Sequence, residues 1–199
     1  MASDVKSETA YKFLLKTSKN KKHHRLNKFL KETEIISIDS RRNKNLSLKF
    51  FIIKTIIGQQ VSIGAAASIW KKTEKLLNHK KRISLADLTD CGLSKPKASY
   101  INEVLSNQNL DCYTKKDLKK MNQVDISNLF LKIKGIGPWT LGIIQMFYLG
   151  QEDIYLTGDL GIKKAGLNFF KSDNYEAKEI GRAHVRTPVT EKSRMPSSA

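Results

Sequence analysis

The sequence predicts an all-α protein, and three observations lead to this prediction. Apolar residues recur at steps of three and four along most of the chain, which is the spacing of an amphipathic helix. Glycines interrupt this pattern at Gly58 and at Gly135–Gly137, where one helix is expected to end and the next to begin. The alternation typical of a strand is visible only at Ile35–Ile38 and is too short to be convincing.

The first half of the chain contains two short helices and then a long helical segment. The short helices are expected at Ala10–Thr17 and Arg25–Thr33. A polar, basic stretch at Ser37–Asn45 separates them from Leu46–Leu77, whose apolar positions follow the helical period on both sides of a break near Gly58.

The second half contains further helices on both sides of a glycine-rich corner. In chain order they are expected at Leu93–Leu105, Asp117–Met121, Asp125–Ile133, Pro138–Leu149 and Asp159–Phe170. Pro138 suits the first turn of a helix, because the N–H group that proline lacks would have no partner there.

The last residues, 179–199, differ from the rest of the chain. Arg, Pro, Ser and Thr replace the dominant Lys, Ile and Asn, and the apolar period stops. The text EIGRAHV, followed by TPVT, resembles the conceptual translation of a DNA-sequencing adapter. We expect either a disordered tail, which is common at termini, or non-native sequence in place of the true C-terminus.

The net charge is strongly positive, with 36 Lys and Arg against 19 Asp and Glu, or +17 in total. A basic surface of this size attracts a polyanion, most often nucleic acid. An alternative is that genomic base composition enriches Lys, Ile and Asn, so that part of the charge is incidental. A basic RNA- or ribosome-associated protein would also explain the charge.

Several classes of protein are disfavoured by composition. The two cysteines, Cys91 and Cys112, lack metal-ligand spacing, so we expect no zinc site, iron–sulfur cluster or disulfide framework, and a reducing cytosol. No run of about 18 apolar residues predicts a membrane span. The N-terminus shows no secretory signal pattern.

The corner at Lys134–Gly142 reads KGIGPWTLG. Two glycines allow a turn with positive φ and no Cβ clash, and they leave the first N–H groups of the next helix bare. A phosphate can approach such groups closely. The pattern is typical of a helix-hairpin-helix, which grips the DNA backbone without reading sequence. The triplet GIG alone is weak evidence, since many helix corners carry two glycines.

Three companions strengthen this interpretation. IIGQQVSIGAAA occupies Ile56–Ala67, Trp139 directly follows the corner, and Asp159 in LTGDLG lies 22 residues after Gly137. Each also has an ordinary explanation: exposed amides at a helix start, a core tryptophan, and a helix N-cap.

Together, IIGQQVS, KGIGPWT and GDLG resemble the helix-hairpin-helix (HhH-GPD) DNA glycosylase superfamily, most closely its 3-methyladenine DNA glycosylase II branch, over about Leu46–Phe170. The resemblance implies two helical lobes with DNA and a base pocket at the cleft between them. It implies a glycosylase domain at 46–178, after N-terminal helices and a basic linker at 1–45 and before the tail at 179–199.

The resemblance also assigns roles to single residues. Asp159 matches the catalytic aspartate, Trp139 a wall of the base pocket, and Gln60 a side chain that wedges into the gap left by a flipped nucleotide. The DNA-binding positions are Gln59, Gln60, Ser62, Gly135, Ile136, Gly137 and Thr140. Family hairpins hold a monovalent cation (Na⁺ or K⁺) through backbone carbonyls, here those of Leu131, Ile133 and Ile136. No cofactor is otherwise required.

These assignments imply base excision repair by a monomer acting on alkylated bases in double-stranded DNA, in a bacterial-type cytosol or in a eukaryotic nucleus. A purine alkylated at N3 or N7 is cationic and already a good leaving group, so Trp139 could stack on it while Asp159 stabilises the charge on the sugar. Strand-cutting relatives carry a lysine just after the corner, where this chain has Pro138 and Trp139, so a monofunctional enzyme is expected.

The sequence departs from the family pattern in two places. The Trp-x-Pro-Tyr/Trp-Arg segment that completes the pocket in alkyl-purine enzymes does not follow Glu179. The N-terminal β-rich domain of larger relatives is absent or reduced to the helices before Ser37. The alternative function is a non-catalytic helix-hairpin-helix DNA-binding module, which would need neither Asp159 nor the glutamines Gln59 and Gln60.

Overall fold

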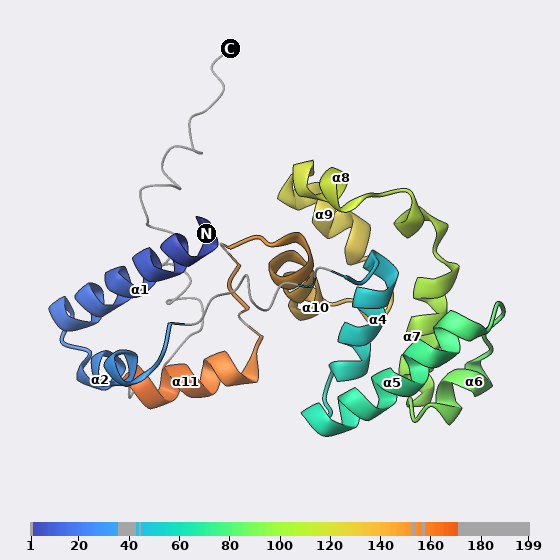
Figure 1. Ribbon diagram of the computed structural model, residues 1–199, viewed down its shortest axis with the longest axis horizontal. Coiled ribbons are helices and arrows are strands. Elements are labelled where there is room, and N and C mark those ends of the chain that lie inside the picture. The colour runs from blue at the N-terminus through green and yellow to red at the C-terminus, as the bar shows by residue number, and fades with distance from the viewer. Residues whose placement is uncertain (1, 36–42, 44, 153, 157, 171–199) are drawn as a thin grey trace, which may run out of the picture. The chain divides into compact units, whose positions relative to one another are not determined.

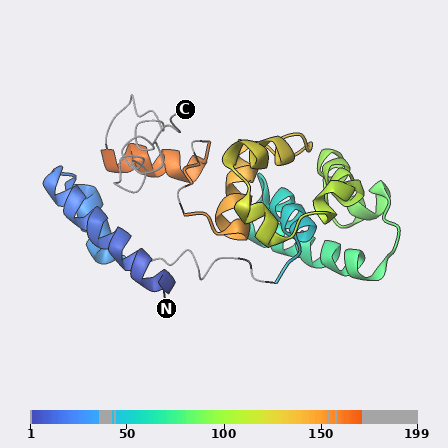
Figure 2. The ribbon, with the colours of Figure 1, turned by 90° about the horizontal axis from the view of Figure 1, so that it is seen from above.

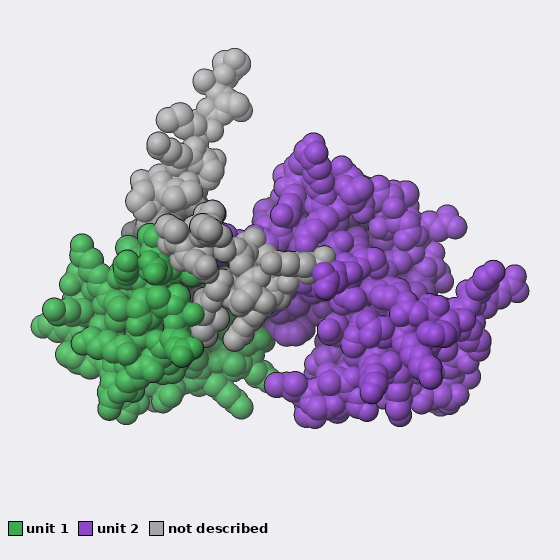
Figure 3. Space-filling view, viewed as in Figure 1, with its two compact units in different colours: residues 1–40, 155–199 green, residues 41–154 purple. Residues whose placement is uncertain are grey.

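The computed structural model describes residues 2–35, 43, 45–152, 154–156 and 158–170. Every regular element within these ranges is a helix, which confirms the all-α prediction (Figure 1). The chain divides into two compact units, residues 1–40 with 155–199 and residues 41–154 (Figure 3). None of the described helices is both long enough and apolar enough to cross a bilayer. The expected domain boundaries at 45 and 178 stay a prediction.

The first unit begins with a pair of packed helices, α1 (Ala2–Asn20) and α2 (His24–Glu32) (Figure 2). The Tyr11 hydroxyl donates a hydrogen bond to the Leu30 carbonyl and so ties the middle of α1 to the end of α2. Leu30 is buried in this pair, so α2 directs its apolar side inward and its lysines outward.

Helix α11 (Leu160–Phe170) belongs to the same unit although it lies far along the chain. The Arg25 guanidinium of α2 donates to the carbonyl of Asn168 at 3.1 Å. The rings of Phe29 and Phe169 pack with centroids 5.1 Å apart. These contacts join the segment that follows residue 155 to the N-terminal helices.

The second unit is built around α4 (Leu48–Gly58), which packs against α5, α7, α10 and η2. The other elements, in chain order, are α5 (Ile63–His79), α6 (Leu85–Asp90), α7 (Lys95–Ser106), the 3₁₀-helix η1 (Gln108–Asp111), α8 (Lys115–Lys120), α9 (Gln123–Phe130), α10 (Pro138–Ile143) and the π-helix η2 (Ile144–Leu149). Because α4 is apolar on nearly every side, it can be buried on nearly every side.

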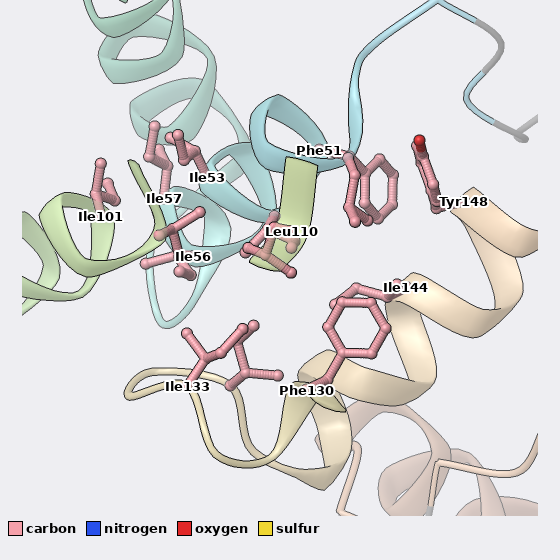
Figure 4. Packing of buried hydrophobic residues seen from close by; sticks show 14 of the residues in the cluster. Phe51, Ile53, Ile56, Ile57, Ile101, Leu110, Phe130, Ile133, Ile144 and Tyr148 are labelled. Atoms are coloured by element: carbon pink, nitrogen blue, oxygen red, sulfur yellow. The ribbon is translucent and has the colours of Figure 1, made fainter. Parts of the chain in front are cut away.

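The core of this unit surrounds α4 and reaches the glycine-rich corner (Figure 4). Phe51 packs on Tyr148 of η2, with ring centroids 5.4 Å apart. Phe130, at the end of α9, is fully buried, and Ile133 and Ile136 of the corner are each only 4% exposed. The corner is therefore anchored in the core by its apolar side chains, and its backbone is held at the surface.

The expected helices are present, most with ends displaced by one to three residues, but α1 begins eight residues before the expected Ala10, and two short elements were missed. Helix α6 and the 3₁₀-helix η1 are too short to show a period, although Ser84 and Asp87 form a capping box at the start of α6. The hydrogen bond from Lys80, with those from Ser84, holds the pKa of Asp87 at about 2.

Three other expectations concern the helix after Pro138, the candidate strand and the tail. The helix expected at Pro138–Leu149 changes to π-helical pairing after Ile143 and ends at Gly150, whose φ is +77°. Ile35 lies in no strand, and the remaining residues of that candidate strand lie outside the described ranges. The whole tail at 179–199 also lies outside them.

Candidate functional site

The glycine-rich corner forms two tight turns between α9 and α10. The Ile133 N–H donates to the Phe130 carbonyl and the Ile136 N–H donates to the Ile133 carbonyl, both at 3.1 Å. Gly137 is the N-cap residue of α10, and the Leu141 N–H donates to its carbonyl at 2.9 Å. The backbone of this hairpin is thus a sequence of local hydrogen bonds that leads directly into the first turn of α10.

The two glycines of the hairpin have different structural environments. Gly135 has φ +86°, and a Cβ placed on it would lie 2.7 Å from ring atoms of Tyr100. Gly137 is extended, with φ −93° and ψ −179°, and a Cβ placed on it would meet nothing within 4 Å. Gly135 is therefore required by the fold, whereas Gly137 keeps the approach to the start of α10 open.

Two residues of α7 contact the backbone of the hairpin. The Tyr100 ring packs against Gly135, and the Glu103 carboxylate accepts a hydrogen bond from the Lys134 N–H at 3.2 Å. Tyr100 and Glu103 are three positions apart, so they lie on the same face of the helix. Sequence reasoning missed both residues, because no local pattern says which face of α7 lies under the hairpin.

The two glutamines of the α4–α5 corner, Gln59 and Gln60, have different surroundings. The Gln59 side-chain amide donates to the Gly135 carbonyl at 3.1 Å and to the Thr140 hydroxyl at 2.9 Å. Gln60 is exposed and has a positive φ of 55°, which is uncommon for a residue with a side chain. Thus Gln59 contacts the hairpin, while Gln60 lies at the surface of the turn.

Other expected DNA-binding residues are partly engaged within the protein. The Ser62 hydroxyl caps α5 by accepting from the Ala65 N–H at 3.2 Å. Thr140 is only 2% exposed, and Ile136 is buried. The side chains of Thr140 and Ile136 are therefore part of the interior, and these two residues can offer DNA only their backbone groups.

Lys97 fixes the backbone of the α4–α5 corner and was not anticipated from the sequence. Its ammonium group donates to the carbonyls of Ile57, at 2.9 Å, and of Gln59. A cation at a helix C-terminus complements the partial negative charge of the last carbonyls. Partial burial lowers the pKa of Lys97 below its usual value.

The expected pocket and cation-binding positions lie at the two ends of the hairpin. Trp139 is half-buried in the first turn of α10, so it is neither a full core residue nor a fully exposed one. Leu131 caps the C-terminus of α9 and is 44% exposed. Within the described ranges, no cluster of three or more His, Cys, Asp or Glu side chains is placed to hold a metal ion.

Asp159 lies in the first unit, immediately before α11. One carboxylate oxygen, Oδ1, accepts a hydrogen bond from the Ile162 N–H at 3.0 Å, and the Asp159 carbonyl accepts from the Lys163 N–H at 3.0 Å. Asp159 is therefore a helix N-cap, the ordinary explanation considered above. A Cβ on Gly161 would lie 3.0 Å from Oδ1, so a small residue at 161 leaves space for the carboxylate.

Comparison with known proteins places these features in a family. No protein-family model matches the chain. A DNA-3-methyladenine glycosylase of Saccharomyces cerevisiae is 31% identical over 182 residues, which cover 81% of this chain and 57% of that protein. A crystal structure of a DNA-3-methyladenine glycosidase from Bacillus halodurans matches with a TM-score of 0.60 and 26% identity, over 73% of this chain and 69% of that one.

The chain belongs to the 3-methyladenine DNA glycosylase family. Membership confirms the resemblance based on the three motifs. A 3-methyladenine DNA glycosylase of Schizosaccharomyces pombe, solved in complex with abasic DNA, shares the fold with a TM-score of 0.57 at 15% identity, over 78% of this chain and 88% of that one. The chain spans about half the length of the curated relatives it matches, between 41% and 61%.

Proposed function

We propose that this chain is a DNA glycosylase that hydrolyses the N-glycosidic bond of alkylated purines of the 3-methyladenine type in duplex DNA. It flips the damaged nucleotide out of the helix and does not cut the strand. The observation that carries this proposal is the hairpin with an open Gly137 at the start of α10, in a chain of this family. The enzyme is expected to act as a monomer where cellular DNA lies, in a bacterial-type cytosol or in a nucleus.

DNA binding begins at the phosphate backbone. The open position at Gly137 lets a phosphate reach the first N–H groups of α10, and a net charge of +17 favours any approach of DNA. Gln60 is exposed on the neighbouring turn, in keeping with a role as the wedge that fills the space of the flipped nucleotide. These contacts carry no sequence information, which suits an enzyme that must find damage in any sequence.

The chemistry requires an aromatic surface and a carboxylate. A cationic alkylated purine stacks favourably on an aromatic face, which half-buried Trp139 would offer. Loss of the base leaves positive charge on the sugar, which the Asp159 carboxylate would stabilise while orienting the attacking water. The hydrogen bond from the Ile162 N–H fixes the orientation of that carboxylate before substrate binds.

The hairpin also has the chemistry of a monovalent cation site. The carbonyls of Leu131, Ile133 and Ile136 would hold Na⁺ or K⁺ near the C-terminus of α9, where the helix dipole is negative. Neutral carbonyls suit a monovalent ion, whereas a divalent ion usually takes carboxylates, and the described residues include no acidic cluster. Such an ion would brace the loop and complement a phosphate.

Release of bases from methylated DNA tests the proposed function. Duplex DNA treated with a methylating agent is incubated with the chain, and the free bases are separated and identified. The expected product is a methylated purine, released by the wild type and not by Asp159→Asn. Binding of the same DNA without release of any base would favour the alternative of a non-catalytic DNA-binding module.

Duplex binding is expected to depend steeply on salt and weakly on sequence. Each phosphate contact releases condensed counterions, so log affinity should fall almost linearly with log salt, with a slope of about −0.9 per contact. Fluorescence anisotropy with several unrelated duplexes between low and physiological salt measures the slope. A slope near zero, or strong preference for one undamaged sequence, would argue against phosphate-based binding.

Excision is expected to leave an intact abasic strand. Forming a Schiff base needs an amine near the sugar, and the two positions after the hairpin are Pro138 and Trp139. Lys134 lies before the two glycines, on the side of the hairpin away from α10. Borohydride reduction during the reaction should therefore trap no protein–DNA adduct, with a strand-cutting glycosylase as positive control. A trapped adduct would contradict this prediction.

A further inference from the structure

We infer that Gln59 is a positioning residue that sets the spacing between the wedge and the phosphate-binding hairpin, and does not itself contact DNA. This inference rests on the proposed function and deepens it. The carrying observation is that the Gln59 side-chain amide hydrogen-bonds to Gly135 of the hairpin and Thr140 of α10, which lie 76 and 81 positions further along the chain.

Gln59 is held at both its ends. At the backbone, its carbonyl accepts a hydrogen bond from Lys97, which also binds the carbonyl of Ile57 at the end of α4. At the side chain, Nε2 donates to the Gly135 carbonyl at 3.1 Å and to the Thr140 hydroxyl at 2.9 Å. The residue therefore connects a fixed helix end to a fixed hairpin.

The expected wedge and the open phosphate position each lie close in the chain to one of the residues that this contact joins. Gln60, the expected wedge, is the next residue in the chain and is exposed with φ 55°. Gly137, the open phosphate position, lies two residues after Gly135. A wedge can act only while the neighbouring phosphates are held, so the distance between these two loops decides whether both engage the same duplex. A displacement of about 1 Å can lower a rate by about a hundredfold.

The chemistry of the contact requires an amide at position 59. The Gly135 carbonyl can only accept, so its partner must donate. Thr140 is 2% exposed, so its hydroxyl depends on a partner inside the protein. Methionine has a similar length and no donor, and glutamate would place a carboxylate against the Gly135 carbonyl. Gln60, the neighbouring exposed glutamine, provides a matched control of the same residue type.

A double-mutant cycle in the full chain tests the inference. The variants are Gln59→Met, Thr140→Val, both together, and the control Gln60→Met with and without Thr140→Val. The Kd for a duplex containing a tetrahydrofuran abasic analogue and the kcat for release of methylated purines are measured well below the unfolding temperature of each variant. Thermal unfolding of every variant is recorded in parallel.

Gln59→Met should raise the Kd and lower the kcat, each by about tenfold, because the hairpin and the wedge lose their fixed spacing. In the Thr140→Val background the same change should cost less than about threefold, because residues in contact have non-additive effects. Gln60→Met should have the same effect in both backgrounds. Gln59→Glu should be no better than Gln59→Met.

Two results would overturn the inference. An equal loss from Gln59→Met in both backgrounds would mean that Gln59 contacts DNA directly. A loss of thermal stability with Kd and kcat unchanged would mean that its contacts serve the fold alone. Failure of the wild-type chain to bind DNA or to release bases would overturn the proposed function instead. The two failures are distinguishable, because this one is seen in the wild type before any residue is substituted.

Discussion

Asp159→Asn is expected to lower base excision by at least about a hundredfold, the scale of a lost electrostatic or base contribution. Asparagine keeps the size of the side chain but removes the charge that would face the sugar. Its oxygen can still accept the hydrogen bond that the Ile162 N–H now donates at 3.0 Å, and asparagine is as good an N-cap as aspartate. The start of α11 should therefore be preserved, and affinity for lesion-containing DNA should be retained.

Single-turnover release of methylated purines, with thermal unfolding of the same samples, measures this effect. Asp159→Ala serves as the control, since it removes the charge and also the cap, at a cost of about 1 kcal/mol in stability. Excision should be equally low in both variants, while only the alanine variant should unfold earlier. Wild-type excision by Asp159→Asn would remove Asp159 from the catalytic role.

Gly137→Val is expected to weaken binding to every duplex alike, by about tenfold or more, the scale of one lost hydrogen bond to a charged group. A side chain at this position would stand where a phosphate approaches α10. The protein itself has room for it, because a Cβ would meet nothing within 4 Å and the extended backbone suits a β-branched residue. Anisotropy with several duplexes, damaged and undamaged, measures the change.

Gly135→Val provides the contrast for that experiment. Here φ is +86° and the new Cβ would lie 2.7 Å from the Tyr100 ring, so strain and overpacking should destabilise the fold by about 2–4 kcal/mol. The two substitutions should thus have different effects: the one at Gly135 lowers stability, and the one at Gly137 lowers affinity for DNA in a stable protein. A loss confined to one DNA sequence in Gly137→Val would contradict a role in phosphate binding.

The sequence predicted the helices well because their signals are local. The apolar period and the break near Gly58 are within reach of a short window, and α4 and α5 end and begin beside that break. Helix α6 was missed although the capping box of Ser84 and Asp87 marks its start. The π-helical pairing after Ile143 was also missed, and the helices that η2 packs against, α4 and α8, lie outside any short window around it.

The candidate site was predictable as a set of positions but not as a set of contacts. Gly135 and Gly137 are the same residue type, and their roles differ because of their backbone conformations and because the ring of Tyr100 lies against Gly135 alone. Gln59 and Gln60 are adjacent and identical in type, yet one binds the hairpin and the other is exposed. These differences come from residues far along the chain, which no local pattern reports.

The N-cap at Asp159 has a consequence for how this position can change during evolution. Selection for α11 alone accepts any short side chain with an oxygen acceptor, so aspartate, asparagine, serine and threonine would all preserve the helix start. A descendant that abandoned excision but kept DNA binding would therefore drift among those four residues and would not acquire an apolar one. Substitution by asparagine, serine or threonine would mark lost chemistry in a lineage, while an apolar residue would mark a weakened start of α11 as well.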